Sequence, residues 1–293
     1  MIWALFSLFS GLTYCVQSEL NKHYKIDGFR LNTFRSLFSA LLMVPLIPFM
    51  EWPSIPEYYL VLVLEGAISV VGMMVQYNLA ATQNGRIANL HQPIAIMLTF
   101  VFWLSIDETQ RAFLLANPVK GLCIMLAFVI FITSLQFIRR GEMGMKILLS
   151  VIPVAVLYSL MSVVSKIALE HGDSLLEISL NFVFISNIMM FLLSFPVLVS
   201  QKMRPNAKKP PLVIDRKLIK AAFSIGFFHT ISWVSVCIAI ILTPNPAYPG
   251  IITGLGPIWF MLYYKARGIP DSASPIAGLF MTLAALLLLF VTN

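Results

Sequence analysis

The chain of 293 residues is 59% hydrophobic and only 11% charged, with a formal net charge of +7. Soluble proteins carry about 25% charged residues, so this composition excludes a soluble globular protein. The positive charge gathers at one set of connections between apolar stretches, which favours membrane orientation over nucleic-acid binding.

Ten apolar stretches follow one another along the chain, and each is long enough at ~1.5 Å per residue to cross a ~30 Å hydrocarbon layer as a helix. A helix satisfies its own backbone hydrogen bonds where there is no water. We therefore predict membrane-spanning helices over residues 2–20, 31–50, 58–82, 87–106, 118–138, 147–169, 176–200, 217–242, 247–265 and 274–292.

The first stretch has no basic segment before it and no small-residue cleavage site, so we expect a retained span rather than a signal peptide. Cys15, Cys123 and Cys237 each lie within an apolar stretch. We expect them to be small buried hydrophobes and predict no disulfide framework and no metal site.

An even number of spans puts both termini on one side of the membrane. All Lys and Arg residues except Arg111, Lys120 and Lys166 fall at the connections on the opposite side, Arg35 among them. Basic connections stay cytoplasmic, so the sequence predicts a multi-pass protein of the cell (inner) membrane with both termini outside. The segment Lys202–Lys220 is then a solvated cytoplasmic loop attracted to anionic headgroups.

The two halves of the chain resemble each other. The pattern Tyr14-x-x-x-Ser18-x-x-x-Lys22 recurs in the second half as Tyr158-x-x-x-Ser162-x-x-x-Lys166, and Pro93 of the fourth stretch matches Pro257 of the ninth. Five spans per half force the second half to lie upside down relative to the first, as in inverted-repeat transporters. We predict an all-α integral membrane protein with two inverted five-helix repeats, 1–142 and 143–293, around a central cavity.

Two stretches of the sequence resemble the drug/metabolite transporter superfamily, in particular its ten-span EamA-like members. One is Tyr14–Lys22 (YCVQSELNK) followed by Phe34–Ala40 (FRSLFSA); the other runs from Tyr77–Thr82 (YNLAAT) through Pro93 to Asp107-Glu108. The resemblance implies that spans 1–4 and 6–9 surround the cavity and that spans 5 and 10 are peripheral. It also implies cytoplasmic termini, the reverse of what the charges indicate.

Polar residues within the spans are the candidates for solute contacts, because burial in lipid costs several kcal/mol without a partner or a cavity. Glu65 is either a carboxylate that binds a proton or cation, or a residue near the outer interface that is reached by water or paired with a neighbouring helix. His229 and Trp233 lie one helical turn apart, and either contact a solute or pack structurally. The candidate cavity-lining residues are Tyr14, Gln17, Gln76, Tyr77, His91, Gln92, Tyr158, Asn187, His229 and Trp233; the coupling candidates are Glu65 and His229.

Motifs for ATP binding, zinc-dependent hydrolysis and serine hydrolysis are absent from the sequence. We therefore expect no catalytic residues and no cofactor. The sequence favours a secondary transporter of small organic metabolites, such as an amino acid or a similar amphipathic solute, acting by alternating access as a monomer or weak dimer in the bilayer. A flippase of a lipid-linked carrier and a membrane enzyme acting on a lipid are the alternatives.

Overall fold

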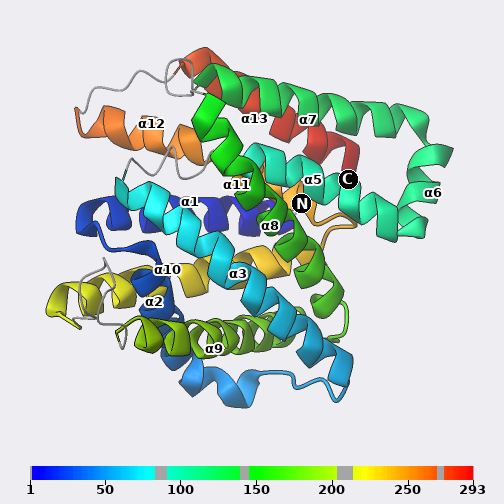
Figure 1. Ribbon diagram of the computed structural model, residues 1–293. Helices are drawn as coiled ribbons and strands as arrows, with labels where there is room; N and C mark the ends of the chain where they lie inside the picture. The colour runs from blue at the N-terminus through cyan, green and yellow to red at the C-terminus, as the bar shows by residue number, and fades with distance from the viewer. Residues whose placement is uncertain (1, 83–90, 139–144, 203–213, 269–273, 293) are drawn as a thin grey trace. The chain divides into compact units, whose positions relative to one another are not determined.

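Helices make up the regular structure of this protein. The computed structural model describes residues 2–82, 91–138, 145–202, 214–268 and 274–292, and these ranges contain no strand (Figure 1). The predicted all-α fold class is confirmed.

The helices follow the predicted apolar stretches closely in chain order. They are α1 (Ile2–Tyr24), α2 (Gly28–Met43), the 3-10 helix η1 (Val44–Phe49), α3 (Pro56–Thr82), α5 (Gln92–Ile106), α6 (Glu108–Ala116), α7 (Pro118–Ile138), α8 (Met145–Leu169), α9 (Leu175–Lys202), α10 (Arg216–Ile241), α11 (Ala247–Thr253), α12 (Gly256–Ala266) and α13 (Pro275–Thr292).

By length and composition, six helical segments within the described ranges are able to cross a membrane: Gly28–Phe49, Pro56–Asn78, Ile152–Leu169, Leu175–Ser200, Arg216–Ile241 and Pro275–Thr292. Helices α6 and α7 meet at an angle of 107° and add a seventh span if the bent pair is taken as one. Helix α5 is apolar but shorter. The fold is thus that of a helical protein with six or seven membrane-compatible spans.

Two of the predicted spans do not form a single long apolar helix. Span 2–20 forms helix α1, but its last turns carry the polar residues Gln17, Glu19 and Asn21. Span 247–265 is divided into α11 and α12, because Pro257 stands in the first turn of α12 and lacks the N–H group that a continuous helix requires.

A helix that the sequence did not predict lies between the fourth and fifth stretches. Asp107 caps α6, since its carboxylate accepts a hydrogen bond from the backbone N–H of Gln110 at 3.0 Å. Gln110 is the buried residue of this helix, whereas Leu115 is 77% exposed. The segment is therefore a short amphipathic helix rather than a loop.

The surface of the chain is apolar and its interior contains many polar groups, the reverse of a soluble protein. Leu60, Leu122 and Phe290 are among the large apolar side chains that are more than two-thirds exposed, whereas Asn32 and Asn181 are fully buried. Lipid solvates such apolar faces, and polar groups in membrane helices face the protein interior. This distribution is consistent with a membrane protein.

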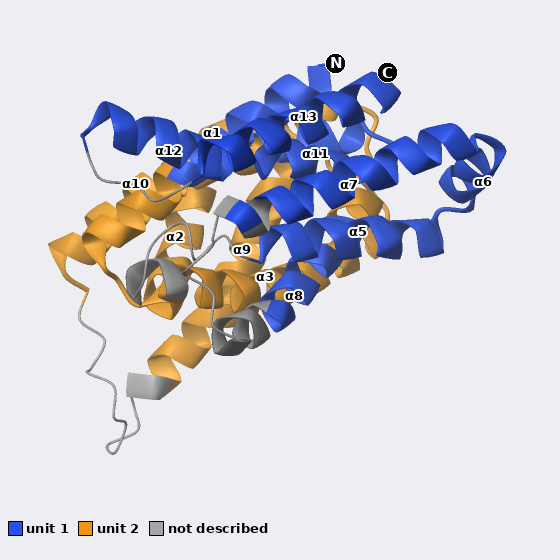
Figure 2. Ribbon diagram, turned by 90° about the horizontal axis from the view of Figure 1, so that it is seen from above, with its two compact units in different colours: residues 1–15, 89–163, 235–293 blue, residues 16–88, 164–234 orange. Residues whose placement is uncertain are grey.

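The described chain forms two compact units, and each draws segments from both halves of the sequence (Figure 2). Unit 1 contains residues 1–15, 89–163 and 235–293; unit 2 contains residues 16–88 and 164–234. The predicted repeats 1–142 and 143–293 rest on the similarity between the two halves of the sequence. The two units do not test that similarity, so the division into repeats stays a prediction.

In unit 2, helices α2, α3 and α9 pack against one another along their lengths. Close approach depends on Gly66 of α3, where a Cβ atom would come within 2.8 Å of the Cβ of Met189 in α9. Gly226 of α10 similarly lies against the backbone of α2, and its carbonyl accepts a hydrogen bond from Ser39 at 3.1 Å. Small residues at such contacts let membrane helices approach closely.

In unit 1, α7 packs along α13 and α5 packs against α11. Aromatic side chains fill the core between them: the rings of Phe100 and Phe128 lie 4.7 Å apart, and Phe131 is fully buried. Gly250 of α11 admits Ile96, since a Cβ at this position would lie 2.8 Å from Cγ1 of that side chain. Unit 1 is thus held by aromatic and aliphatic packing.

We expect Gly66→Ala to lower the thermal stability of the purified protein, because the added methyl group meets the base of the Met189 side chain rather than its flexible end. Overpacking of this kind costs ~1–3 kcal/mol. Gly121→Ala is the matched control, since the nearest atom to its added Cβ is a carbonyl oxygen 3.7 Å away. Equal melting temperatures for the two variants in detergent would contradict this account of the α3–α9 contact.

Candidate functional site

A fully buried arginine lies at the centre of unit 2. Arg35 of α2 is 0% exposed, and its Nη1 atom donates a hydrogen bond to Oδ1 of Asn187 in α9 at 3.1 Å. Its Nη2 atom donates to Oδ1 of Asn32 at 2.7 Å and to the sulfurs of Met73 and Met190 at 3.2 and 3.3 Å. Helices α2, α3 and α9 thus all contribute to the surroundings of one positive charge.

The local sequence places Arg35 on the inner side of α2. Asp27 caps this helix by accepting a hydrogen bond from the backbone N–H of Arg30 at 3.2 Å. Helical periodicity then brings Asn32, Arg35 and Ser39 onto one buried side, one turn apart. These three residues form a polar stripe on α2, and the stripe faces α9 and α10.

This position corrects the charge analysis. We counted Arg35 among the basic residues of the connections, but the structure buries it inside a membrane-compatible helix. Lys166, which we counted among the basic residues on the side of the termini, is also buried. It is 5% exposed, and its Nζ atom lies 3.3 Å from the Glu170 carboxylate. Arg139 and Arg140, and three of the seven basic residues between 202 and 220 (Arg204, Lys208 and Lys209), lie outside the described residues.

Glu65 of α3 is also fully buried, which leaves a functional carboxylate or one paired with a neighbouring helix as the predicted alternatives. Its Oε1 atom accepts a hydrogen bond from Ser69, one turn later, at 2.6 Å. Ser186 of α9 lies beside the carboxyl group, and its hydroxyl is close enough to interact with Glu65. The charge of Arg35 lies within electrostatic range of Glu65.

Gln17, His229 and Trp233 form a chain of contacts in the same unit. Nδ1 of His229 and Oε1 of Gln17 lie 3.3 Å apart. The imidazole is 4.9 Å from the Trp233 ring in an edge-to-face arrangement, and Trp233 contacts Phe182 in the same way at 6.0 Å. Arg35 also lies within electrostatic range of His229. Three predicted residues are therefore brought together by α1 and α10.

The predicted residues on the last turns of α3 have different environments. Tyr77 is 4% exposed, and its backbone carbonyl accepts a hydrogen bond from Nδ2 of Asn21 at 2.9 Å. Gln76 is also buried. Oδ1 of Asn78 accepts a hydrogen bond from the backbone N–H of Gly28 at 2.7 Å, which fixes the start of α2 against α3. This part of α3 thus has a structural function that the sequence did not reveal.

Four buried polar atoms near these residues make no hydrogen bond within the described ranges. They are Nε2 of Gln17, Nδ2 of Asn32, Oε2 of Glu65 and Nε2 of His229. A buried donor or acceptor without a partner costs ~1–3 kcal/mol, and native proteins rarely accumulate such groups away from functional positions. These atoms are therefore candidates for contact with a bound polar molecule or with water.

The remaining predicted residues belong to unit 1. The rings of His91 and Tyr158 lie 4.4 Å apart within this unit. Gln92 begins α5 and is partly buried, and Tyr14 is partly buried on α1.

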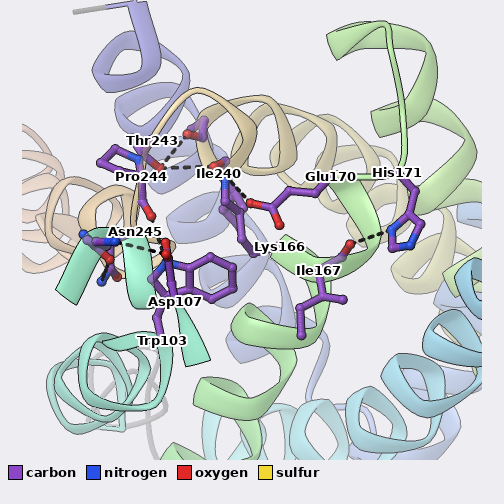
Figure 3. A network of polar contacts seen from close by, with 12 residues as sticks. Trp103, Asp107, Lys166, Ile167, Glu170, His171, Ile240, Thr243, Pro244 and Asn245 are labelled. Atoms are coloured by element: carbon purple, nitrogen blue, oxygen red, sulfur yellow. Dashed lines mark hydrogen bonds and ion pairs between the residues drawn. The ribbon is translucent and has the colours of Figure 1, made fainter. Parts of the chain in front are cut away.

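A second polar network in unit 1 holds the corner between α5 and α6. Nε1 of Trp103 donates hydrogen bonds to Oδ2 of Asp107 at 3.1 Å and to the carbonyl of Pro244 at 2.8 Å (Figure 3). Nε2 of Gln110 donates to the Tyr248 hydroxyl at 3.2 Å. These bonds join the α5–α6 corner to Pro244 and to Tyr248. They hold the fold together, and none of them points to a ligand.

Sequence reasoning missed Arg35 and Asn32 as site residues. A charged residue four positions inside a predicted span was the available signal, because an ionisable group within a membrane helix is functional or paired by default. The span boundary, placed at residue 31, instead grouped Arg35 with the neighbouring loop charges. Within the described residues, no group of three or more His, Cys, Asp or Glu side chains is arranged to hold a metal ion.

Comparison with known proteins supports the fold and leaves the activity open. No family model and no curated protein matches the sequence. Among 24 matching chains of known structure, one described only as "Crystal structure of protein" aligns with a TM-score of 0.67 at 14% identity. The alignment covers 99% of this chain and 98% of that one, so the whole chain shares an already observed fold.

We expect Asn187→Leu to destabilise the protein, because it removes a hydrogen bond to a buried charge. Such bonds contribute about 1.5–3 kcal/mol. Ser200→Ala on the same helix is the control, since the Ser200 hydroxyl is exposed and bonds only the carbonyl of Val197 in its own helix. Thermal unfolding in detergent compares the two, and an unchanged melting temperature for Asn187→Leu would show that Arg35 does not depend on α9.

Proposed function

We propose that this chain is a secondary transporter that moves a small organic metabolite across the cell membrane by alternating access. The observation that carries the proposal is the fully buried pair of charged side chains, Arg35 and Glu65, inside segments apolar enough to cross a membrane. Charged groups at such depth are costly and mark solute or ion pathways in membrane proteins.

The internal contacts support a ten-span inverted repeat. Span 2 corresponds to span 7 in the proposed repeat, span 5 to span 10 and span 4 to span 9. Three of these equivalent pairs pack together, α2 with α9 in unit 2, and α7 with α13 and α5 with α11 in unit 1, beside the non-equivalent pairs α2–α3 and α3–α9. Elements next to a two-fold axis contact their own counterparts, so this pairing is what a two-fold relation between the halves requires.

Neither alternative has comparable support. A flippase of a lipid-linked carrier needs an apolar groove open to lipid, whereas the unsatisfied groups near Arg35 are polar and enclosed. A membrane enzyme needs acids or a His–acid pair that face each other, and the described contacts of His229 are with Gln17 and Trp233. The transporter needs no cofactor, and its partners are the solute and the bilayer.

The first test is a thermal-shift screen of the purified protein against a metabolite library. A ligand that binds only the folded state stabilises it by mass action, by ~2.7 kcal/mol at a hundred times its Kd. Uptake or counterflow of each positive compound in proteoliposomes then tests transport. Binding without movement across the membrane would leave a receptor, and chemical conversion of the compound would favour an enzyme.

We expect His229→Ala and Trp233→Ala each to reduce uptake of the identified solute about tenfold, the effect of losing one buried polar or ring contact of ~1.4 kcal/mol. Phe227→Ala is the matched control, because Phe227 lies on the same helix and is 45% exposed. Unchanged uptake and binding in both α10 variants would remove these residues from the site.

We also propose that both termini face outward, from the distribution of basic residues. Lys217→Cys, at an exposed position on the first turn of α10, is then labelled by a membrane-impermeant maleimide only after cells are opened. Lys120→Cys on α7 is the opposite control and is labelled in intact cells. Both variants carry alanine at the three native cysteines. The reverse labelling pattern would give the orientation that the family resemblance implies.

A further inference from the structure

Glu65 is an acid buried in a membrane-compatible helix without an ion-pair partner. Its side chain in α3 is 0% exposed, and none of the ion pairs found between the described residues includes it. An ionised carboxylate is far more costly to bury than a neutral carboxylic acid, so proton binding is the ordinary way to avoid that cost. Ionisable groups at such positions in membrane proteins often belong to proton pathways.

The groups around the Glu65 carboxyl suit both of its protonation states. The Ser69 hydroxyl donates a hydrogen bond to Oε1 at 2.6 Å. Oε2 and the Ser186 hydroxyl of α9 lie close enough to interact, and neither is bonded to any other group in the described part of the chain. A hydroxyl group both donates and accepts. Ser186 therefore donates to Oε2 of the carboxylate, or accepts from the O–H of the acid after its hydroxyl hydrogen rotates.

The charged and titratable groups near Glu65 come from few elements. Arg35 of α2 is the charged side chain described within electrostatic range of it. From α9 the facing side chain is the uncharged Ser186. Tyr77, farther along α3, and His229 of α10 are titratable groups within range of Arg35. The charge state of Glu65 is thus coupled to that of Arg35 before any other group.

Glu65 also lies where α3 and α9 pack closely. The next residue, Gly66, has no space for a side chain, because an added Cβ would come within 2.8 Å of the Cβ of Met189 in α9. Arg35 contacts both helices, through Met73 and Asn187. A change of charge on Glu65 therefore alters the forces between helices in contact. Proton binding thereby has a means to favour one conformation over another.

We propose that Glu65 binds and releases a proton in each transport cycle, so that solute movement is coupled to proton movement, an inference that rests on the proposed transport function. The proton comes from water and bonds to Oε2, and the new O–H group donates to the Ser186 hydroxyl. On release the proton returns to water, and Ser186 donates to the carboxylate.

A proton is also the ligand that this position accommodates without a cavity, because it adds one hydrogen atom within an existing contact. A divalent metal ion needs several oxygen ligands around it. Within the described ranges, no group of three or more His, Cys, Asp or Glu side chains is arranged to supply them. Proton binding is therefore favoured over metal-ion binding at Glu65.

The binding test measures the protonation of Glu65 directly. Infrared difference spectra of the purified protein are recorded over about pH 4 to 10, the range between the reference pKa values of Glu and Lys. We expect a carboxylic-acid carbonyl band that changes with pH and is lost in Glu65→Gln. Glu57→Gln, at an exposed position on the same helix, is the control and keeps the band. A Glu65 that stays ionised, or stays protonated, over the whole range would overturn the proposal.

The coupling test uses a proton gradient as the driving force. Each compound that crosses the membrane in the proteoliposome assay is supplied at equal concentrations on both sides, with the membrane potential held at zero by valinomycin and equal potassium. A gradient of about one pH unit, worth ~1.36 kcal/mol per proton, is applied in each direction in turn and gives about tenfold accumulation at one proton per solute. Protein-free liposomes correct for passive movement.

We expect accumulation by the native protein and by Glu57→Gln, and equilibration without accumulation by Glu65→Gln. Glutamine has the shape of glutamate and keeps an oxygen that accepts the Ser69 hydrogen bond, so the fold is retained. Undiminished accumulation by Glu65→Gln would show that the coupling proton binds elsewhere. Accumulation driven by a sodium gradient and not by the pH gradient would replace the proton with a metal cation.

A second variant keeps the carboxyl group and changes its partner. Ser186→Ala removes the hydroxyl that lies beside Oε2, so we expect the infrared band of Glu65 to titrate at a different pH. Ser200→Ala, on the same helix, is the control and leaves the titration unchanged, because its exposed hydroxyl bonds only the carbonyl of Val197. Identical titrations in the two serine variants would contradict the role given to Ser186.

The proton assignment and the transport function fail differently. If compounds cross the membrane down their own gradients and ignore the pH gradient, the transport function stands and proton coupling at Glu65 is wrong. If the infrared band titrates but no compound crosses the membrane, the transport proposal fails, and the coupling role of Glu65 fails with it.

Discussion

The structure of unit 2 depends on one physical constraint, the burial of a positive charge inside a bundle of apolar helices. Removing an arginine from water costs several kcal/mol, which hydrogen bonds and nearby charges must offset. Arg35 satisfies this requirement with groups from α2, α3 and α9, so three helices are fixed in register around one guanidinium. The close α3–α9 contact at Gly66 and the α2–α10 contact at Gly226 follow from the same arrangement, because the polar groups meet only if the backbones approach closely.

The inverted distribution of polarity explains why the polar groups lie inside. Water drives apolar side chains inward in a soluble protein, whereas lipid solvates them, so Leu60 and Phe290 remain outside at no cost. Polar groups such as Asn181 then bond with neighbouring helices: its Oδ1 atom accepts a hydrogen bond from the Tyr58 hydroxyl at 2.8 Å. Most buried polar groups are satisfied in this structural way. Exceptions within the described residues include atoms of Gln17, Asn32, Glu65 and His229 in unit 2, together with Nδ2 of Asn181 itself and Nε1 of Trp259 in unit 1.

The helical class and the positions of most helices were predictable from the sequence, because apolar length and punctuation by Pro, Gly and charge determine where a membrane helix begins and ends. The break between α11 and α12 had its signal in Pro257, although the same residue was taken only as a repeat marker. Helix α6 was missed because nine residues are too short for a periodicity argument. The site was harder to predict. Glu65, His229 and Trp233 were recognised as polar or aromatic groups within spans. The importance of Arg35, however, depends on Asn187, which is distant in sequence and reaches it only through the packing of α2 on α9.

A transporter must bind its solute and also release it, and an enclosed charge makes the second step difficult. The attraction between unit charges rises as the dielectric constant falls, so an anion paired only with Arg35 would be held tightly. A resident acid changes this balance, because it interacts with Arg35 whether or not a solute is present and reduces the net gain from binding. Neutral partners such as Asn187 and the two methionines add orientation without adding attraction. For the proposed transport function, a positive charge that donates hydrogen bonds to neutral groups and has a buried acid within range therefore attracts an anion less strongly than an isolated arginine would, which favours repeated binding and release.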